Sequence, residues 1–253
     1  MNIVIPMSGI GQRFLDAGYR EPKPLIKVEG KPIVQHVIER FSPSDQFLFI
    51  CNADHLETTP MRQILQAIAP KGTIVSIAPH KLGPVYAVRQ AQELIDDDEE
   101  VIVNYCDFSW RWDYQAFQRT VKESQCDGCV VAYKGFHPHL LHKNLYASMR
   151  DDGHMRMLEI REKHSFTPNN QDCYQSSGTY YFRSGRILKT YFQKLMDGHE
   201  DLNGEYYVSM VFQKLVADGL LVRIFEIPFM LQWGTPEDLQ EYLYWSEVFR
   251  KQH

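Results

Sequence analysis

Short apolar runs alternate with helical patterns through the first part of the chain. Runs rich in β-branched residues predict buried strands, at residues 2–6, 46–51, 73–77 and 101–105. Apolar residues at helical spacing predict helices between these strands, at residues 32–41, 56–69 and 84–95. Strands that alternate with helices of this length indicate an α/β fold with a mixed, mainly parallel sheet flanked by helices.

The second half of the chain has a different pattern. Two short alternating runs, 144–150 and 155–160, flank Asp151-Asp152-Gly153 and predict a small β-hairpin. Further patterns predict strands at residues 129–133, 178–182 and 221–227, and helices at 185–196, 204–217 and 236–249. Because no repeat, low-complexity tract or linker interrupts the sequence, we predict a single domain over residues 1–253. Its two halves are expected at about 1–135 and 136–253.

Composition and charge exclude several classes of protein. The 253 residues carry a net charge of −5, which gives no general affinity for nucleic acid or an anionic membrane. The sequence lacks the run of about 18 apolar residues that a membrane-spanning helix needs. The N-terminus enters a strand without a basic region before it, so we expect no signal peptide and a cytoplasmic protein.

The cysteines do not form a metal-binding pattern. Five are present, and Cys126 and Cys129 form a C-x-x-C, but no second C-x-x-C or histidine pair follows at zinc spacing. Cys129 also begins an apolar strand pattern. Accidental spacing is therefore favoured over a redox or metal role.

The stretch after the first strand contains the strongest candidate chemistry. It reads MSGIGQRFLDAGYREPKPL and supplies Gly9, Gly11, Arg13 and Lys23. Glycines let the backbone approach an anion closely, and two cations ten residues apart can bind the same anion. The dinucleotide fingerprint G-x-G-x-x-G fails at Phe14, and no Gly-Lys-Ser/Thr completes a P-loop. The loop is therefore a candidate triphosphate-binding site that follows neither of these two patterns.

Three motifs together resemble the nucleotidyltransferases that make activated sugars and related phosphate esters. These motifs are G-x-G-x-R-F, E-P-K-P-L and the V-x-x-K-P form of residues 28–32. The family is similar to the NDP-sugar pyrophosphorylases. The resemblance implies a Rossmann-like fold, with a nucleotide-binding first half and an acceptor-binding second half. It also implies a nucleotide site in which the base is contacted mainly by the main chain, formed by Met7, Ser8, Gly9, Gly11, Arg13, Lys23 and Gly83. The glycine loop, residues 78–83 and Asp107 all follow predicted strands, where ligands of such sheets bind.

Asp107 follows a buried strand and has two interpretations. It could cap a helix that we expect to begin near Trp110, or it could bind a metal. The resemblance favours the metal, because its family places an aspartate after this strand to hold the Mg²⁺ of the nucleotide. Magnesium needs only one or two carboxylates besides phosphate oxygens and water.

Matches in the second half imply an acceptor site. The family carries an E-K pair after the hairpin, which matches Glu162 and Lys163, and its lysine meets the phosphate of the acceptor. Its N-A-G-x-Y segment resembles residues 177–180 and assigns Gly178 to the acceptor pocket. A solvated charged loop is the ordinary alternative for residues 161–163.

The last match contains a departure. Residues 232–239 read QWGTPEDL, whereas the family begins this motif with an aspartate that joins the metal site. Gln232 is a poorer magnesium ligand, so a second carboxylate is missing or comes from elsewhere, with Glu205 as a candidate. The Q-W-G-T-P-E-D-L form resembles the cytidylyltransferases of capsular phosphoramidate synthesis, which use CTP and a phosphorylated glutamine.

These resemblances predict an enzyme that joins the nucleoside monophosphate of an NTP to a phosphorylated small molecule and releases pyrophosphate. CTP and L-glutamine phosphate are the expected substrates, for capsule modification, and Mg²⁺ is the expected cofactor. Arg13, Lys23 and Lys163 are the expected catalytic residues. A sugar-1-phosphate nucleotidylyltransferase and a non-catalytic nucleotide-binding module are the alternatives. A glycosyltransferase is less favoured, because Asp107-Phe108-Ser109 lacks the Asp-x-Asp of that class. A homodimer is compatible with the sequence, which does not determine the oligomeric state.

Overall fold

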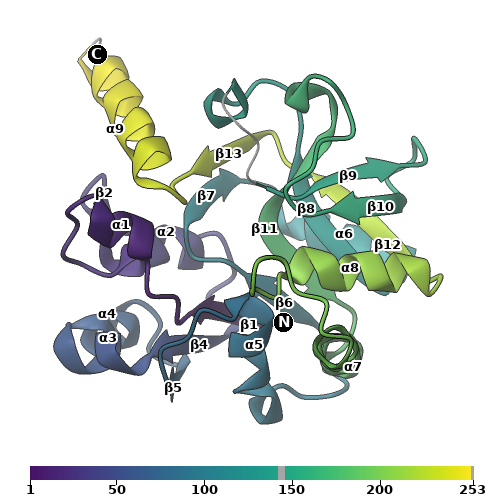
Figure 1. Ribbon diagram of the computed structural model, residues 1–253, viewed down its shortest axis with the longest axis horizontal. Helices are drawn as coiled ribbons and strands as arrows, with labels where there is room; N and C mark the ends of the chain where they lie inside the picture. Colours follow the sequence, from purple (N-terminus) through teal and green to yellow (C-terminus); the bar gives the residue numbers. More distant parts are fainter. Residues whose placement is uncertain (142–145, 252–253) are drawn as a thin grey trace.

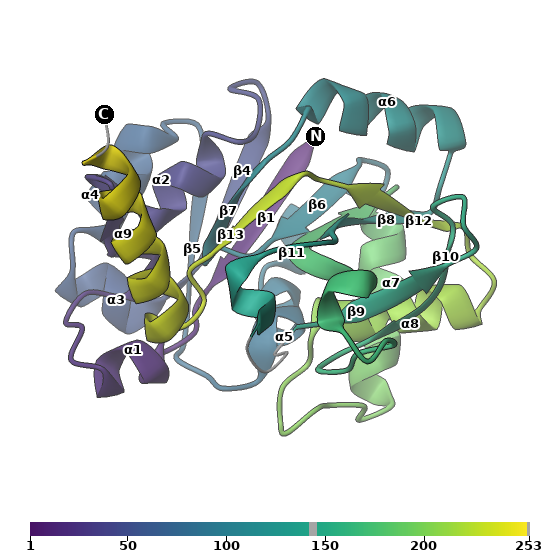
Figure 2. The same ribbon diagram turned by 90° about the horizontal axis from the view of Figure 1, so that it is seen from above.

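A nine-stranded mixed sheet forms the centre of the molecule (Figures 1 and 2). The computed structural model describes residues 1–141 and 146–251. The main path of the sheet is β10-β9-β11-β6-β1-β4-β5, and β8 pairs with β11 and β12. Neighbouring strands are parallel from β6 through β1 and β4 to β5, whereas β11 runs antiparallel to β6 and β8. The predicted mixed, mainly parallel sheet is confirmed.

The strands of this sheet and of two small ribbons, β2–β3 and β7–β13, have the following bounds. They are β1 Asn2–Met7, β2 Lys27–Val28, β3 Lys31–Pro32, β4 Gln46–Asn52, β5 Thr73–Ile77, β6 Val101–Asn104, β7 Phe108–Arg111, β8 Gly128–Tyr133, β9 Ser148–Asp151, β10 Met157–Arg161, β11 Tyr174–Phe182, β12 Val222–Glu226 and β13 Phe229–Gln232.

Helices cover both faces of the sheet, which explains the continuous apolar runs in its strands. The helices are α1 Gln12–Asp16, α2 Ile33–Ile38, α3 Ala53–Thr58, α4 Met61–Ile68, α5 Gly83–Arg89, α6 Tyr114–Ser124, α7 Gly185–Asp197, α8 Val208–Ala217 and α9 Pro236–Arg250. Side chains alternate between the faces. Val4 packs in a core with α5, α7 and α8, whereas Ile3 and Ile5 pack in a second core with α2, α4 and α6 (Figure 2).

The predicted helix over 56–69 is wrong in its extent, because the structure contains two helices there. Pro60 lacks a backbone N–H and disfavours helical backbone in the residue before it. Thr59 is accordingly extended, with φ −133° and ψ 165°, and separates α3 from α4. The helix predicted over 84–95 ends at Arg89 and is followed by a short 3₁₀ turn.

The helix expected near Trp110 begins later, at α6. Phe108 and Trp110 instead lie in β7, which pairs antiparallel with β13. The side chain of Asp113, not Asp107, caps α6. The helix-cap interpretation of Asp107 is therefore wrong.

The predicted hairpin is present as β9 and β10, although residues 144 and 145 of that prediction lie outside the described residues. β11 begins at Tyr174, before the predicted start at residue 178, and α8 begins at Val208, after the predicted start at 204. Within the described part of the chain, no helix combines the length and apolar character that a membrane span requires.

A third, small core joins the opening loop to the C-terminal helix. Phe14 of α1 and Leu239 of α9 are both buried in it, together with Trp233. The ring of His36 packs edge-to-face on Trp233, and its Nε2 lies 2.8 Å from the carbonyl oxygen of Val28. The segment that begins α9 is thereby fixed against the β2–β3 ribbon.

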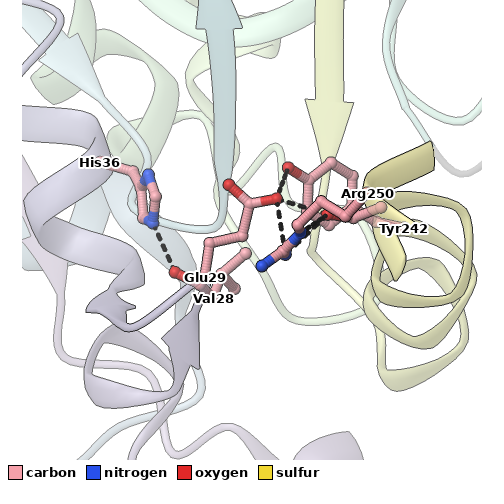
Figure 3. Close-up of polar contacts among 6 residues, drawn as sticks. Val28, Glu29, His36, Tyr242 and Arg250 are labelled. Atoms are coloured by element: carbon pink, nitrogen blue, oxygen red, sulfur yellow. Dashed lines mark hydrogen bonds and ion pairs between the residues drawn. The ribbon is translucent and has the colours of Figure 1, made fainter. Parts of the chain in front are cut away.

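The outer part of α9 is held by one carboxylate on the β2–β3 turn (Figure 3). Oε1 of Glu29 accepts hydrogen bonds from the hydroxyls of Tyr242 and Ser246, at 3.0 and 2.5 Å, and from Nη2 of Arg250 at 3.1 Å. The hydrogen bond from Ser246 is the largest cause that lowers the pKa of Glu29. The ionised carboxylate is therefore the form that holds α9 in place.

We predict that Glu29→Gln lowers the free energy of unfolding at neutral pH. Because these contacts are partly exposed, the loss should be on the order of 0.5–1 kcal/mol, or about 1–4 °C in melting temperature. Because the pKa of Glu29 is lowered in the folded state, the ionised carboxylate stabilises the fold at pH values above 4.5, the ordinary glutamate pKa. This stabilisation is lost as the pH falls through the pKa of the folded state. Thermal melts from pH 7 to pH 3 should therefore show the difference from wild type narrowing below pH 4.5; a pH-independent difference would contradict the prediction.

Candidate functional site

A cavity of about 520 Å³ opens at the carboxyl ends of the parallel strands. The glycine loop after β1, the segment after β5 and the link between β6 and β7 line one side of it. Residues after β10, the middle of β11 and the segment before α8 line the other side. All the site residues predicted from the sequence are in its lining: Met7, Ser8, Gly9, Gly11, Arg13, Lys23, Gly83, Asp107, Glu162, Lys163, Gly178, Glu205 and Gln232.

The opening loop presents one cation to the cavity. Gly11 precedes α1 with a φ of +73°, a left-handed conformation that favours glycine. Buried Phe14 anchors the short helix, while Arg13 is exposed on it. Over residues 1–141 and 146–251, the side chain of Arg13 forms no ion pair or hydrogen bond, and only its backbone carbonyl accepts one, from Ala17. Its guanidinium is therefore available to an anionic ligand.

The second predicted cation, Lys23, pairs directly with the predicted metal ligand. Its Nζ lies 2.8 Å from Oδ2 of Asp107, and both side chains are about one quarter exposed, at 22% and 25%. Nζ also donates a 3.3 Å hydrogen bond to the carbonyl oxygen of Gly234 and lies 5.5 Å from the ring centroid of Phe14. Sequence reasoning placed both charges in the site but did not predict this pair. A bound anion could pair with Lys23 and a bound cation with Asp107. Two ion pairs with ligands would then replace the one between the two side chains.

Gln232, the departure from the family motif, lies next to this ion pair. A Cβ on Gly234 would come within 2.7 Å of Nε2 of Gln232 and 3.2 Å of Oδ2 of Asp107, so glycine allows the two side chains to approach. Gln232 is only 7% exposed, and its Oε1 has no hydrogen-bond partner in the described structure. An unsatisfied buried oxygen costs about 1–3 kcal/mol. A ligand in the cavity would remove this cost.

The wall after β5 contains a histidine that sequence reasoning missed. His80 Nε2 lies 2.8 Å from Oγ of Ser8, and the backbones of His80 and Gly9 form an isolated parallel bridge. Burial lowers the pKa of His80. In the sequence, only the position of His80 after a predicted strand could have indicated a functional role. A single histidine at such a position is not specific for any function.

Gly83 connects the two sides of the cavity. Its φ is +84°, and a Cβ would lie 2.8 Å from both the nitrogen and the carbonyl oxygen of Tyr206. The backbone N–H of Tyr206 donates to Leu82, and its carbonyl accepts from Val85, at 3.0 and 3.1 Å. The segment that carries Glu205 is thereby docked on the start of α5.

The opposite wall contains two carboxylates and a lysine. The hydroxyl of Ser209 donates to Glu162, although burial, the larger effect, raises the pKa of that carboxyl group. Nζ of Lys163 lies 3.4 Å from the hydroxyl of Tyr207, which also hydrogen-bonds to Glu205. This wall can bind an acceptor that carries both a phosphate and polar groups.

Gly178 shapes this wall by a close contact. Its φ is +90°, and a Cβ would lie 2.7 Å from Cε1 of Phe108 and 3.1 Å from Cδ2 of Tyr105. The neighbouring Ser177 is 2% exposed, and its hydroxyl has no partner among the residues described. Ser177 also lines the cavity; it belongs to the segment 177–180 that resembles the family's acceptor-pocket motif, although only Gly178 of that segment was predicted as a site residue.

The donor set fits a magnesium ion that arrives with a triphosphate. In the described residues, no group of three or more histidine, cysteine, aspartate or glutamate side chains could hold a metal. Beside Gly234, the protein oxygens are the carboxylate of Asp107, which pairs with Lys23, and the unpaired amide oxygen of Gln232. Because Mg²⁺ usually keeps several waters and binds phosphate oxygens, one carboxylate beside a phosphate site suits it. Glu205 lies on the other wall, bonded to Tyr207.

Cys106 lines the cavity, whereas Cys126 and Cys129 do not. All five cysteines are buried and free, and burial raises the pKa of the Cys126 and Cys129 thiols. Buried thiols of raised pKa are weak nucleophiles. This agrees with accidental C-x-x-C spacing.

The fold and the cavity at its strand ends, which contains Arg13, Lys23 and Lys163, define an α/β protein with a site suited to anionic ligands. Residues 3–165 match the family model described as the MobA-like NTP transferase domain. This match covers more than half of the chain, which therefore belongs to this nucleotidyltransferase family.

Curated relatives agree with this assignment. The chain is 28% identical over 228 residues to the bifunctional protein GlmU of Janthinobacterium sp. (strain Marseille), covering 88% of this chain and 46% of that protein. It is 32% identical over 111 residues to GlmU of Cupriavidus necator, covering 42% of this chain and 22% of that protein. The chain thus spans less than half the length of these relatives.

Solved structures show the same fold. A nucleoside-diphosphate-sugar pyrophosphorylase from Vibrio cholerae RC9 has a TM-score of 0.77 and 20% identity, covering 96% of this chain and 99% of that one. The inositol-1-phosphate CTP transferase from T. maritima has a TM-score of 0.73 and 16% identity, covering 98% and 95%.

We predict that Gly83→Ala loosens the contact between α5 and Tyr206 and weakens nucleotide binding. Positive φ and a clash with backbone atoms should together cost about 1–3 kcal/mol. The matched control is Gly153→Ala, since Gly153 has the same φ of +84° but nothing within 4 Å of its Cβ position. Urea unfolding and CTP titration should show a larger loss at position 83. Equal effects of the two substitutions would mean that the Tyr206 contact is unimportant.

Proposed function

We propose that this protein transfers the nucleoside monophosphate of an NTP to a phosphorylated small molecule. An acceptor phosphate oxygen bonds to the α-phosphorus, the bond from that phosphorus to the bridging oxygen breaks, and pyrophosphate leaves with the electron pair. No general base is needed, because a phosphate monoester with a second pKa of about 6 is already largely ionised at neutral pH. The Lys23–Asp107 ion pair in the cavity is the observation that supports the proposal best, since a lysine that could bind phosphate lies beside a carboxylate that could hold a metal ion.

The protein's own groups would position and neutralise the reactants. Arg13 and Lys23 would bind the phosphates that become pyrophosphate, and Lys163 would align the acceptor phosphate. Glu162 and Gly178 would shape the acceptor pocket. Backbone groups of residues 7–11 would approach the nucleotide closely. Asp107 would hold Mg²⁺, with Gln232 beside it, and the ion would supply charge neutralisation on the triphosphate.

CTP and L-glutamine phosphate are the substrates we propose, for capsule modification. The Q-W-G-T-P-E-D-L form of residues 232–239 supports this choice through its resemblance to cytidylyltransferases of capsular phosphoramidate synthesis. The neutral, buried amide of Gln232, where the usual family motif has an aspartate, is consistent with a different acceptor. The similarity to a CTP transferase structure also supports CTP.

A sugar-1-phosphate nucleotidylyltransferase is the second candidate function. It is supported by the similarity to a nucleoside-diphosphate-sugar pyrophosphorylase and to GlmU. The carboxylates of Glu162 and Glu205 are also suitable partners for sugar hydroxyls. A nucleotide-binding module without activity would share the cavity but release no pyrophosphate.

A pyrophosphate-release assay separates these functions. It crosses CTP, UTP, dTTP, ATP and GTP with glutamine phosphate and with sugar 1-phosphates, each with Mg²⁺ and with a chelator. We expect release with CTP and glutamine phosphate that the chelator abolishes. Release with a sugar 1-phosphate instead would support the second candidate. Nucleotide binding without release in any combination would contradict both enzymatic functions for these substrates.

We predict that Arg13→Ala and Lys23→Ala each reduce turnover by about a hundredfold or more, because each removes a charge that stabilises the leaving pyrophosphate. Lys27→Ala is the matched control, since Lys27 is exposed on β2 and does not line the cavity. Steady-state kinetics and melting temperatures should show lost turnover with an intact fold. Normal turnover in both cavity variants would contradict the assignment of the opening loop.

A further inference from the structure

One wall of the cavity is suited to an uncharged planar group. Ser8, His80, Gly83 and Ala87 line it, and exposed Lys81 is its one charged neighbour in the segment after β5. The cations proposed to bind phosphate lie elsewhere, on α1, before β2 and after β10. A nucleoside triphosphate has one charged end and one uncharged end, and its base would therefore occupy the Ser8–His80 wall.

A directional chain of hydrogen bonds runs through this wall. The backbone N–H of Leu82 donates to Nδ1 of His80 at 3.1 Å, so Nδ1 carries no proton. The proton of the neutral ring is therefore on Nε2, which lies 2.8 Å from Oγ of Ser8 and donates to it. Burial lowers the pKa of His80 and favours this neutral form. The ring of Tyr86, with its centroid 4.7 Å away, packs against the imidazole.

The hydrogen bond from His80 limits what the Ser8 hydroxyl can still do. Because its oxygen already accepts from His80, the hydroxyl keeps one proton to donate and one lone pair to accept with. The structure gives that hydroxyl no second partner in the described ranges. The backbone of Ser8 is also fixed, since Nδ2 of Asn52 donates to its carbonyl oxygen at 3.3 Å. The side chain is 2% exposed and lines the cavity, so the remaining partner would be the ligand.

We propose that the Leu82–His80–Ser8 chain selects cytosine over uracil. This inference rests on the proposed function, because it requires a pyrimidine nucleotide in the cavity. Cytosine presents an unprotonated N3 that can accept the proton of the Ser8 hydroxyl. N3 of uracil carries a proton, so the Ser8 oxygen could only accept from it, and the buried hydroxyl proton would be left without a partner. Ser8 is the specificity-determining residue, and His80 is a positioning residue that acts through it.

The test measures dissociation constants of CTP and UTP with Mg²⁺ and no acceptor, so that it does not depend on turnover. The wild type should bind CTP about tenfold or more tightly than UTP, as expected where a site leaves a donor unpaired with the wrong ligand. Ser8→Ala and His80→Ala should each bring this ratio near one. The double variant should show no further loss, because His80 acts only through Ser8.

Two further variants distinguish a loss of base selectivity from a general structural effect of substituting a histidine. His80→Gln keeps an N–H at the position of Nε2 and should retain part of the preference for CTP. His36→Gln, at another half-buried histidine that does not line the cavity, should leave the ratio unchanged. Circular dichroism and melting temperatures show which variants remain folded.

The outcomes distinguish this inference from the proposed function. Equal losses of CTP and UTP affinity in Ser8→Ala would overturn the inference, since the hydroxyl would then face a group that both nucleotides share. A wild-type preference for UTP, or additive effects of the two alanine substitutions, would overturn it as well. If the wild type binds no nucleoside triphosphate at all, the proposed function itself is wrong.

Discussion

The organisation of the cavity depends on the ion pair between Lys23 and Asp107. The two residues are 84 positions apart in the chain, and their contact at 2.8 Å joins the opening loop to the end of β6. The same lysine reaches the carbonyl of Gly234, so the segment before α9 meets them at one point. Charges that are partly withdrawn from water need compensation. Here each charge compensates the other.

Local patterns were sufficient for most of the fold, and tertiary contacts explain the failures. The strand over 73–77 was predicted with its observed bounds, because most of its residues are β-branched and turn residues flank it. Pro60 divided a predicted helix in a way that local rules could have shown. The strand β7 could not be predicted in this way, since it is defined by pairing with β13, about 120 residues later. The sequence around Trp110 does not reveal that Trp110 pairs with Met230.

Motifs placed the predicted residues around one cavity, but they did not specify how those residues contact one another. The pairing of Lys23 with Asp107, and the unpaired oxygens of Gln232 and Ser177, follow only from the positions of distant segments. His80 is the clearest case. Its importance comes from an adjacent serine on another strand end and from the tautomer that a backbone N–H imposes. Neither can be derived from a lone histidine in a sequence.

The contact between Gly83 and Tyr206 has a consequence for how this cavity could change during evolution. The two walls meet there through main-chain atoms, so the span between them is set by the backbone and not by the size of any side chain. Substitutions along either wall would then alter which groups a substrate meets while the width of the opening stays constant. A cavity of this kind can change its substrate specificity by single amino-acid substitutions, because the backbone that sets its width does not have to change.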